Sequence, residues 1–176
     1  MTDAPRAFPA DAIHLVRTTQ QIGLSLSQMA DQKASILMGA TFVVFTISVN
    51  QAARAPVSLA LVILAFSAFV SAGLAVFAIM PSIGGGKGGA KGLTPAPNIL
   101  FFGHYTGKSE EEFTDEVLSR LRDPETIYRT MLRDIYQNGQ VLQHKKYKYL
   151  GAAYRAFLIG LVLTLAAAVA QWVGLL

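Results

Sequence analysis

Three stretches of the sequence hold apolar residues with no charged residue among them. They cover residues 34–53, 57–80 and 156–176. Each is about as long as the roughly 20 helical residues needed to cross a bilayer core about 30 Å thick. Buried helices of soluble proteins are usually shorter and rarely come three at a time. The pattern therefore predicts three transmembrane helices, of which the first two form a hairpin through a tight turn at residues 50–56.

Helical patterns also lead into the first and third spans. Apolar residues recur at helical spacing from Ile13 to Met29, which predicts an amphipathic helix that runs directly into the first span. Ahead of the third span, Asp123 and Pro124 are residue types favoured at the N-cap and first position of a helix. The apolar stripe that follows has only Gly139 as a breaker. One long helix is therefore expected from Pro124 into the third span.

The segment between the second and third spans begins as a tether and continues as helices. Residues 81–97 are rich in glycine and proline, which is typical of a flexible linker. Lys91 lacks the preceding glycine and the following hydroxyl residue that a phosphate-binding P-loop requires. Ser109 and Glu112 have the spacing of a capping box, which predicts that a helix begins there.

The expected fold is an all-α integral membrane protein with four regions. Residues 1–33 form a cytoplasmic amphipathic helix, and residues 34–80 form a transmembrane hairpin. Residues 81–155 form a tether with a helical cytoplasmic region, and residues 156–176 form a third transmembrane helix. Eleven basic residues lie between Lys87 and Arg155, whereas the turn between the first two spans carries only Arg54. Positive-inside bias therefore places the N-terminus and residues 81–155 in the cytoplasm and the C-terminus outside.

Small residues within the spans are spaced for close helix packing. They recur every four residues at Ser67, Ser71 and Ala75, and again in the third span at Ala166, Ala170 and Gly174. Such stripes let helix backbones approach closely in lipid, although small residues are common in spans generally.

Composition excludes several classes of protein. Charged residues make up 15% of the chain, below the roughly 25% of soluble domains, and hydrophobic residues 52%, which excludes a disordered chain. The absence of cysteine excludes disulfides, thiolate metal sites and cysteine nucleophiles. The net charge is +4, and many of the basic residues lie beside the spans. This position favours the surface of the lipid bilayer over a nucleic acid polymer as the partner.

No catalytic or metal site is assigned from the sequence. The three histidines lack paired ligand spacing, and no hydrolase, kinase or redox signature is present. The acidic residues 110–116 could hold a carboxylate pair, but acidic residues at a helix N-terminus are more simply explained by the helix dipole. An enzyme is therefore not expected.

Binding of a small anionic ligand suits the polar region better than catalysis does. A nucleotide phosphate needs cationic donors, and the candidates are His104, Lys108, Arg129 and Arg133. Arg129 and Arg133 lie four residues apart on one helix face. Contact with lipid headgroups is the alternative explanation for these side chains. The apolar segment 98–105 offers a further alternative, because it could dock a cytoplasmic partner of a non-lethal membrane scaffold.

The sequence resembles the transmembrane effector family of Pycsar anti-phage systems over nearly its whole length. The most specific parts are ADQKASIL at residues 30–37, DIYQNG at 134–139 and KKYKYL at 145–150. The resemblance implies a bacterial inner-membrane protein encoded beside a pyrimidine nucleotide cyclase. On infection the cyclase makes cyclic UMP or cyclic CMP, and the effector then impairs the membrane and kills the cell before phage matures.

Within those segments, four residues are candidates for gating or structural roles: Asp31, Lys33, Asp134 and Tyr136. Asp31 and Lys33 are expected to form an ion pair at the lipid boundary, and Asp134 lies on a helix close to the membrane. Three spans per chain are too few for a wide pore, so membrane damage would require a homo-oligomer. Apart from the activating nucleotide, no cofactor is implied.

Overall fold

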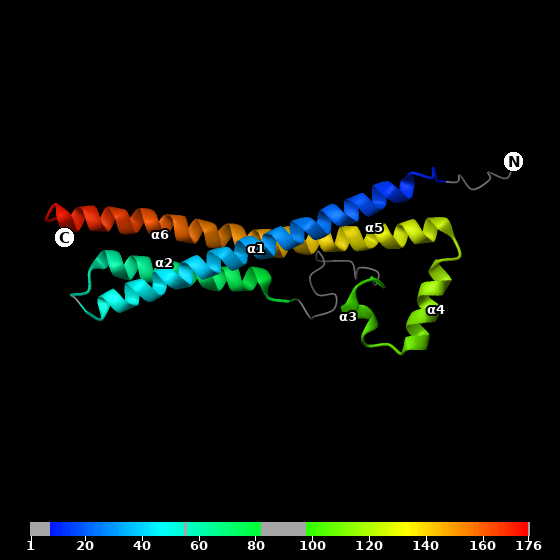
Figure 1. The fold of residues 1–176 in the computed structure, drawn as a ribbon, viewed down its shortest axis with the longest axis horizontal. Coiled ribbons are helices and arrows are strands. Elements are labelled where there is room, and N and C mark those ends of the chain that lie inside the picture. The colour runs from blue at the N-terminus through cyan, green and yellow to red at the C-terminus, as the bar shows by residue number, and fades with distance from the viewer. Residues whose placement is uncertain (1–7, 55, 82–97, 176) are drawn as a thin grey trace, which may run out of the picture. The chain divides into compact units, whose positions relative to one another are not determined.

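The computed structural model describes residues 8–54, 56–81 and 98–175, and every regular element in these ranges is helical. Figure 1 shows the elements, which are α1 (Ala12–Ala52), α2 (Leu59–Ile79), α3 (Phe102–Tyr105), α4 (Glu110–Arg120), α5 (Pro124–Val141), the π-helical segment η1 (Leu142–Tyr147) and α6 (Lys148–Trp172). The expected all-α fold is confirmed. The tether predicted for residues 81–97 lies, beyond Pro81, outside the described residues.

Short-range capping contacts explain where three helices begin. The Ser58 hydroxyl accepts a hydrogen bond from the backbone N–H of Leu61 at the start of α2. Ser109 and Glu112 form the predicted capping box of α4. The carboxylate of Asp123 accepts the backbone N–H of Thr126 at 2.8 Å, at the start of α5. Each contact satisfies an N–H group that a helix start otherwise leaves unpaired.

Two long helices join spans to polar segments, as the sequence predicts. The amphipathic segment and the first span form the single helix α1. The run from Pro124 to Trp172 is helical throughout, with a π-helical stretch at η1. Such π-helical turns are rare and occur frequently at functional sites.

The chain divides into two compact units. Met1–Leu26 and Pro81–Val141 form one, called here the polar unit, and Ser27–Met80 and Leu142–Leu176 form the other, called the span unit. Two of the three boundaries fall inside a helical run, one within α1 and one between α5 and η1, and the third follows the end of α2 at Met80.

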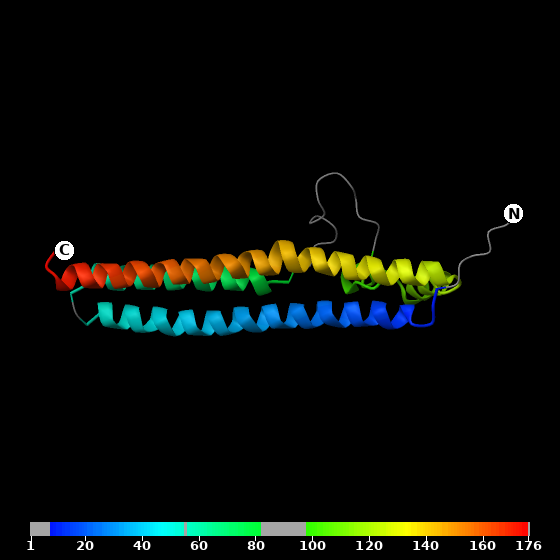
Figure 2. The ribbon, with the colours of Figure 1, turned by 90° about the horizontal axis from the view of Figure 1, so that it is seen from above.

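Small side chains form the interface between α2 and α6 in the span unit, where the two helices lie side by side (Figures 1 and 2). On α2 the buried residues include the predicted stripe of Ser67, Ser71 and Ala75. On α6 they are Ala153, Gly160 and Ala167, together with Leu150. The stripe at residues 166, 170 and 174 is therefore not the face of α6 that packs within the chain. Residues seven apart lie two turns apart on one face, and that face is the one that meets α2.

The span-unit part of α1 packs against the same pair of helices. Ala30 and Ala34 form a buried cluster with Ala78 of α2 and Leu150 of α6. Leu37 forms a second cluster with Ala75 and Ala153. Small residues from all three helices, together with Leu37 and Leu150, therefore make the interior of the span unit.

Large apolar side chains cover the outside of the three long helices. Only 22%, 22% and 17% of the most apolar window of each helix is buried, and Phe42, Phe66 and Leu165 are among the exposed residues. In water such a surface would be a severe aggregation hazard, whereas hydrocarbon is its natural solvent. The three helices are long and apolar enough to cross a membrane, which indicates a multi-pass membrane protein.

Candidate functional site

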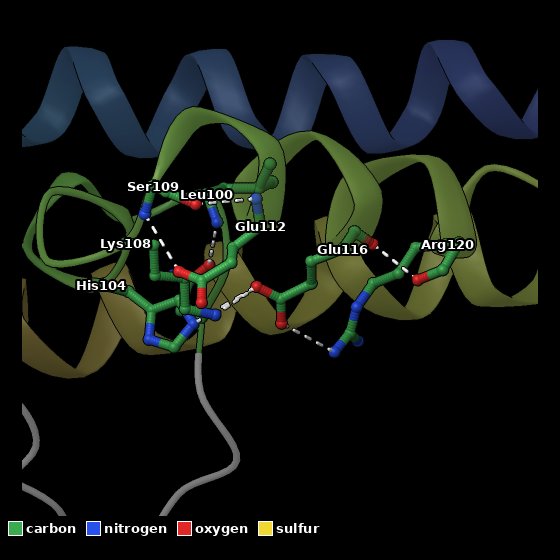
Figure 3. Close-up of polar contacts among 9 residues, drawn as sticks. Leu100, His104, Lys108, Ser109, Glu112, Glu116 and Arg120 are labelled. Atoms are coloured by element: carbon green, nitrogen blue, oxygen red, sulfur yellow. Dashed lines mark hydrogen bonds and ion pairs between the residues drawn. The ribbon is translucent and has the colours of Figure 1, made fainter.

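A cluster of ionisable side chains surrounds Glu116 on α4. Lys108 Nζ lies 2.5 Å from Glu116 Oε2, and His104 Nε2 lies 3.7 Å from the same oxygen. Arg120, one turn further along α4, places a guanidinium nitrogen 3.6 Å from Glu116 Oε1. Figure 3 shows the three side chains converging on the carboxylate. All four are only partly exposed, so water screens them less than side chains on an open surface.

The local structure of α3 and α4 builds this cluster. The capping box at Ser109 starts α4 immediately after Lys108, so that Glu116 lies two turns into the helix. The rings of Tyr105 and Phe113 pack with centroids 4.9 Å apart and hold the end of α3 against α4. Two of the predicted ligand residues, His104 and Lys108, are therefore brought together by a carboxylate and an aromatic pair.

The cluster carries more positive than negative charge, because Lys108 and Arg120 both face the single carboxylate of Glu116. The hydrogen bond from Lys108 is the largest effect and lowers the pKa of Glu116. Burial opposes it, and the charges of Lys108, His104 and Arg120 lower the pKa further, so that the net shift is downward. Glu116 is therefore ionised at neutral pH, but its single charge offsets only one of the two permanent cations. His104 Nε2 is buried and has no hydrogen-bond partner among the described residues.

The other two predicted ligand residues lie on α5. Arg129 is 74% exposed and donates to the Glu125 carboxylate one turn before it, at 2.7 Å from Nε. Arg133 is half-buried. Among the described residues, no hydrogen bond or ion pair connects either arginine with His104 or Lys108.

Asp134, the next residue of α5, is a structural centre of the polar unit. It is only 6% exposed, and its Oδ1 accepts hydrogen bonds from Asn98 Nδ2 at 2.8 Å and Asn138 Nδ2 at 3.0 Å. Its Oδ2 accepts one from Gln20 Nε2 on α1 at 3.2 Å. Three amide donors therefore tie the start of segment 98–105, α5 and α1 to one buried carboxylate. Tyr136, in contrast, is 66% exposed.

Sequence reasoning did not find the three amides around Asp134. Asn138 lies one turn beyond Asp134, so the helical spacing alone could have suggested this contact. Gln20 and Asn98 are 114 and 36 residues away in sequence, and nothing in the local pattern pairs them with Asp134.

At the start of the first apolar stretch, Asp31 pairs with a different lysine from the one predicted. Asp31 Oδ2 accepts a hydrogen bond from Lys146 Nζ of η1 at 2.6 Å, whereas Lys33 is exposed. The predicted Asp31–Lys33 pair is wrong because residues two apart on a helix do not face each other. Lys146 also donates to Ser27 Oγ at 2.8 Å, so it contacts two successive turns of α1.

The chain was also compared with known proteins. Residues 14–173 match the family model of the Pycsar effector protein domain. The matched range contains all eight residues proposed above for ligand binding or gating. Comparisons with curated proteins and with solved structures found no match.

Proposed function

The chain belongs to the Pycsar effector protein family, whose members are membrane effectors of anti-phage defence that act with a cyclase, and on this premise we propose that a cyclic pyrimidine nucleotide activates it. The ligand is cyclic UMP or cyclic CMP, made by the partner pyrimidine nucleotide cyclase on infection. The activated protein impairs the bacterial inner membrane, so that the cell dies before phage matures.

The observation that carries this proposal is the exposed apolar surface of the three long helices. Only about a fifth of each apolar window is buried, and the exposed apolar remainder suits lipid or further copies of the chain. Three helices per chain enclose no wide channel. Membrane damage therefore proceeds through homo-oligomers that assemble or rearrange on activation.

Charge distribution supports an orientation for the protein in the membrane. Lys145, Lys146, Lys148 and Arg155 lie beside the start of the third charge-free stretch, whereas the connection between α1 and α2 carries only Arg54. By the positive-inside rule the N-terminus and the segment between the second and third spans are cytoplasmic, and the C-terminus is outside. This orientation exposes the polar unit to a nucleotide made in the cytoplasm.

The Glu116 cluster is the candidate contact for the nucleotide phosphate. A cyclic phosphate carries one negative charge. The cluster offers the Lys108 ammonium and the His104 Nε2, which has no hydrogen-bond partner among the described residues, and its two permanent cations outnumber its one carboxylate. The phosphate would share Lys108 with Glu116. Arg129 and Arg133 are further candidates on α5, for the phosphate or for stacking on the base.

A thermal shift of the detergent-purified full chain tests binding. A ligand present at 100 times its Kd should add about 2.7 kcal/mol of stability. We expect one of cyclic UMP and cyclic CMP to stabilise the protein, with no shift from cyclic AMP or cyclic GMP. Lys108→Met and His104→Ala should abolish the shift, whereas Lys33→Met, which changes an exposed lysine of the span unit, should retain it. No shift with any of the four nucleotides would indicate that a partner, and not this chain, binds the nucleotide.

A second candidate function is a non-lethal membrane scaffold. It is favoured by the exposure of Leu100 and Phe102, at 43% and 51%, within the apolar segment 98–105. Dye uptake distinguishes the two functions. Cells that co-express the effector with its cyclase should take up a membrane-impermeant dye if the protein damages the membrane, and should exclude it if the protein only docks a cytoplasmic partner.

A further inference from the structure

Two adjacent lysines of η1 bind the two other spans of the span unit. Lys146 Nζ donates to Asp31 Oδ2 at 2.6 Å and to Ser27 Oγ at 2.8 Å, both on α1. Lys145 Nζ donates to the backbone carbonyl of Met80, the C-cap residue of α2, at 2.5 Å. Because η1 leads directly into α6, these contacts join all three spans at one end of the unit.

The helical geometry of η1 explains how neighbouring residues reach different helices. Successive side chains of a helix point in different directions around its axis, so Lys145 and Lys146 diverge toward α2 and α1. Both lie in the π-helical stretch Leu142–Tyr147, where the α-helical hydrogen-bond register shifts. Lys145 also places a positive charge at the C-terminal end of α2, where the helix dipole favours it.

The ion pair between Asp31 and Lys146 is partly buried and lies beside the apolar interior of the span unit. The Lys146 side chain is only 19% exposed and that of Asp31 40%. Asp31 Oδ1 is buried and has no hydrogen-bond partner among the described residues. The contact of Asp31 Oδ2 with Lys146 Nζ therefore balances the negative charge of this carboxylate. Two turns or less beyond Asp31, the buried interior consists of Ala34 and Leu37. Separation of the pair would leave two charges at the edge of an apolar bundle.

We propose that Lys145 and Lys146, with Asp31 and Met80, form a clasp that holds the three spans in the resting arrangement, and that the effector acts on the membrane only when the clasp opens. The clasp connects two segments whose paired residues, Asp31 and Lys146, lie 115 residues apart in the sequence. Asp31 and Lys146 are positioning residues in this mechanism. The proposal rests on the family's role as membrane effector but not on the identity of the activating nucleotide.

Dye uptake in cells without any cyclase tests the clasp. We expect Asp31→Asn and Lys146→Met each to raise the fraction of dye-positive cells at least tenfold over the unmodified protein at equal membrane abundance. The charge-swapped double variant D31K/K146D should return dye uptake to the resting level. Lys148→Met is the matched control, because it removes an exposed charge two residues from Lys146, and it should leave uptake unchanged.

A distance measurement keeps the proposal testable if the single variants accumulate poorly. The chain has no cysteine, so Gln32→Cys on α1 and Tyr154→Cys on α6, both at exposed positions, can carry two spin labels in the purified protein. The distance distribution should broaden in D31N and K146M and narrow again in the charge swap. This readout needs neither nucleotide nor lethality, so it stands even if cyclic pyrimidines do not bind.

Two results would overturn the clasp. One is that D31N and K146M, at normal abundance, neither admit dye nor broaden the distance distribution. The other is that the charge swap behaves like the single variants in both measurements, because the two charges would then act independently of each other.

Discussion

Replacement of Gly160 in α6 by alanine should force α2 and α6 apart. A Cβ at residue 160 would overlap the Cβ and Oγ of Ser67 and lie 3.6 Å from its Cα. Rotation of the Ser67 side chain moves Oγ but leaves its Cβ in place. The clash can therefore be relieved only by displacement of one helix against the other.

Two opposing effects determine how much Gly160→Ala changes the free energy of unfolding. Overpacking of a close interface costs about 1–3 kcal/mol. Alanine within a helix is favoured over glycine by roughly 0.8–1 kcal/mol. Gly151→Ala, also in α6, gains the same preference but meets no atom within 4 Å. The difference between the two variants therefore isolates the clash, at about 1–3 kcal/mol, or roughly 5- to 150-fold in the unfolding equilibrium.

The assay is unfolding of the purified protein in mild detergent by a rising fraction of SDS, followed by circular dichroism. G160A should unfold at a lower SDS fraction than the unmodified chain or G151A. Ser67→Gly removes both clashing atoms, so S67G should restore much of the stability when combined with G160A. Equal midpoints for G160A and G151A would refute the close approach of α2 and α6 at this point, as would failure of S67G to compensate.

Three further predictions concern single contacts. Ser71→Ala removes the hydrogen bond from Ser71 Oγ to the carbonyl of Ala153, 2.8 Å long, and should lower stability in the same SDS titration by about 0.6 kcal/mol. Asp134→Ala deprives three amides of their acceptor and should destabilise the protein by about 1.5–3 kcal/mol, visible as faster hydrogen exchange in α5. The pKa of Glu116 is lowered from 4.5 in the folded state, so its stabilising effect is complete above that pH and lost as pH falls through the folded value. Glu116→Gln should therefore flatten the decrease of Tm between about pH 5 and pH 3.

The candidate site could be predicted only in part. His104 and Lys108 were recognisable as cationic donors near an aromatic segment. Their convergence on Glu116 depends on how α3 turns back onto α4, which the residue types do not specify. Arg129 was recognised by the same reasoning, but it forms a local pair with Glu125 one turn away on its own helix. Residue type therefore found the donors without showing which of them act together.

The sequence by itself determined the long helices and the three candidate membrane spans of this protein, although not the short helix α3 or the π-helical stretch η1. Both depend on interactions between residues close together in the chain. A span needs about 20 consecutive apolar residues, and the capping contacts of Ser109 and Asp123 reach only three residues along the helix.

The tertiary structure alone decided which helix faces meet and which charges pair. Helical periodicity shows which residues share a face, but each span has several faces with small residues. The choice of Ala153, Gly160 and Ala167 depends on the surfaces of α1 and α2 as well as α6. Likewise Asp31 finds its cation 115 residues away, because packing of α1 against η1 brings Lys146 within 2.6 Å, while Lys33 points elsewhere on the same helix.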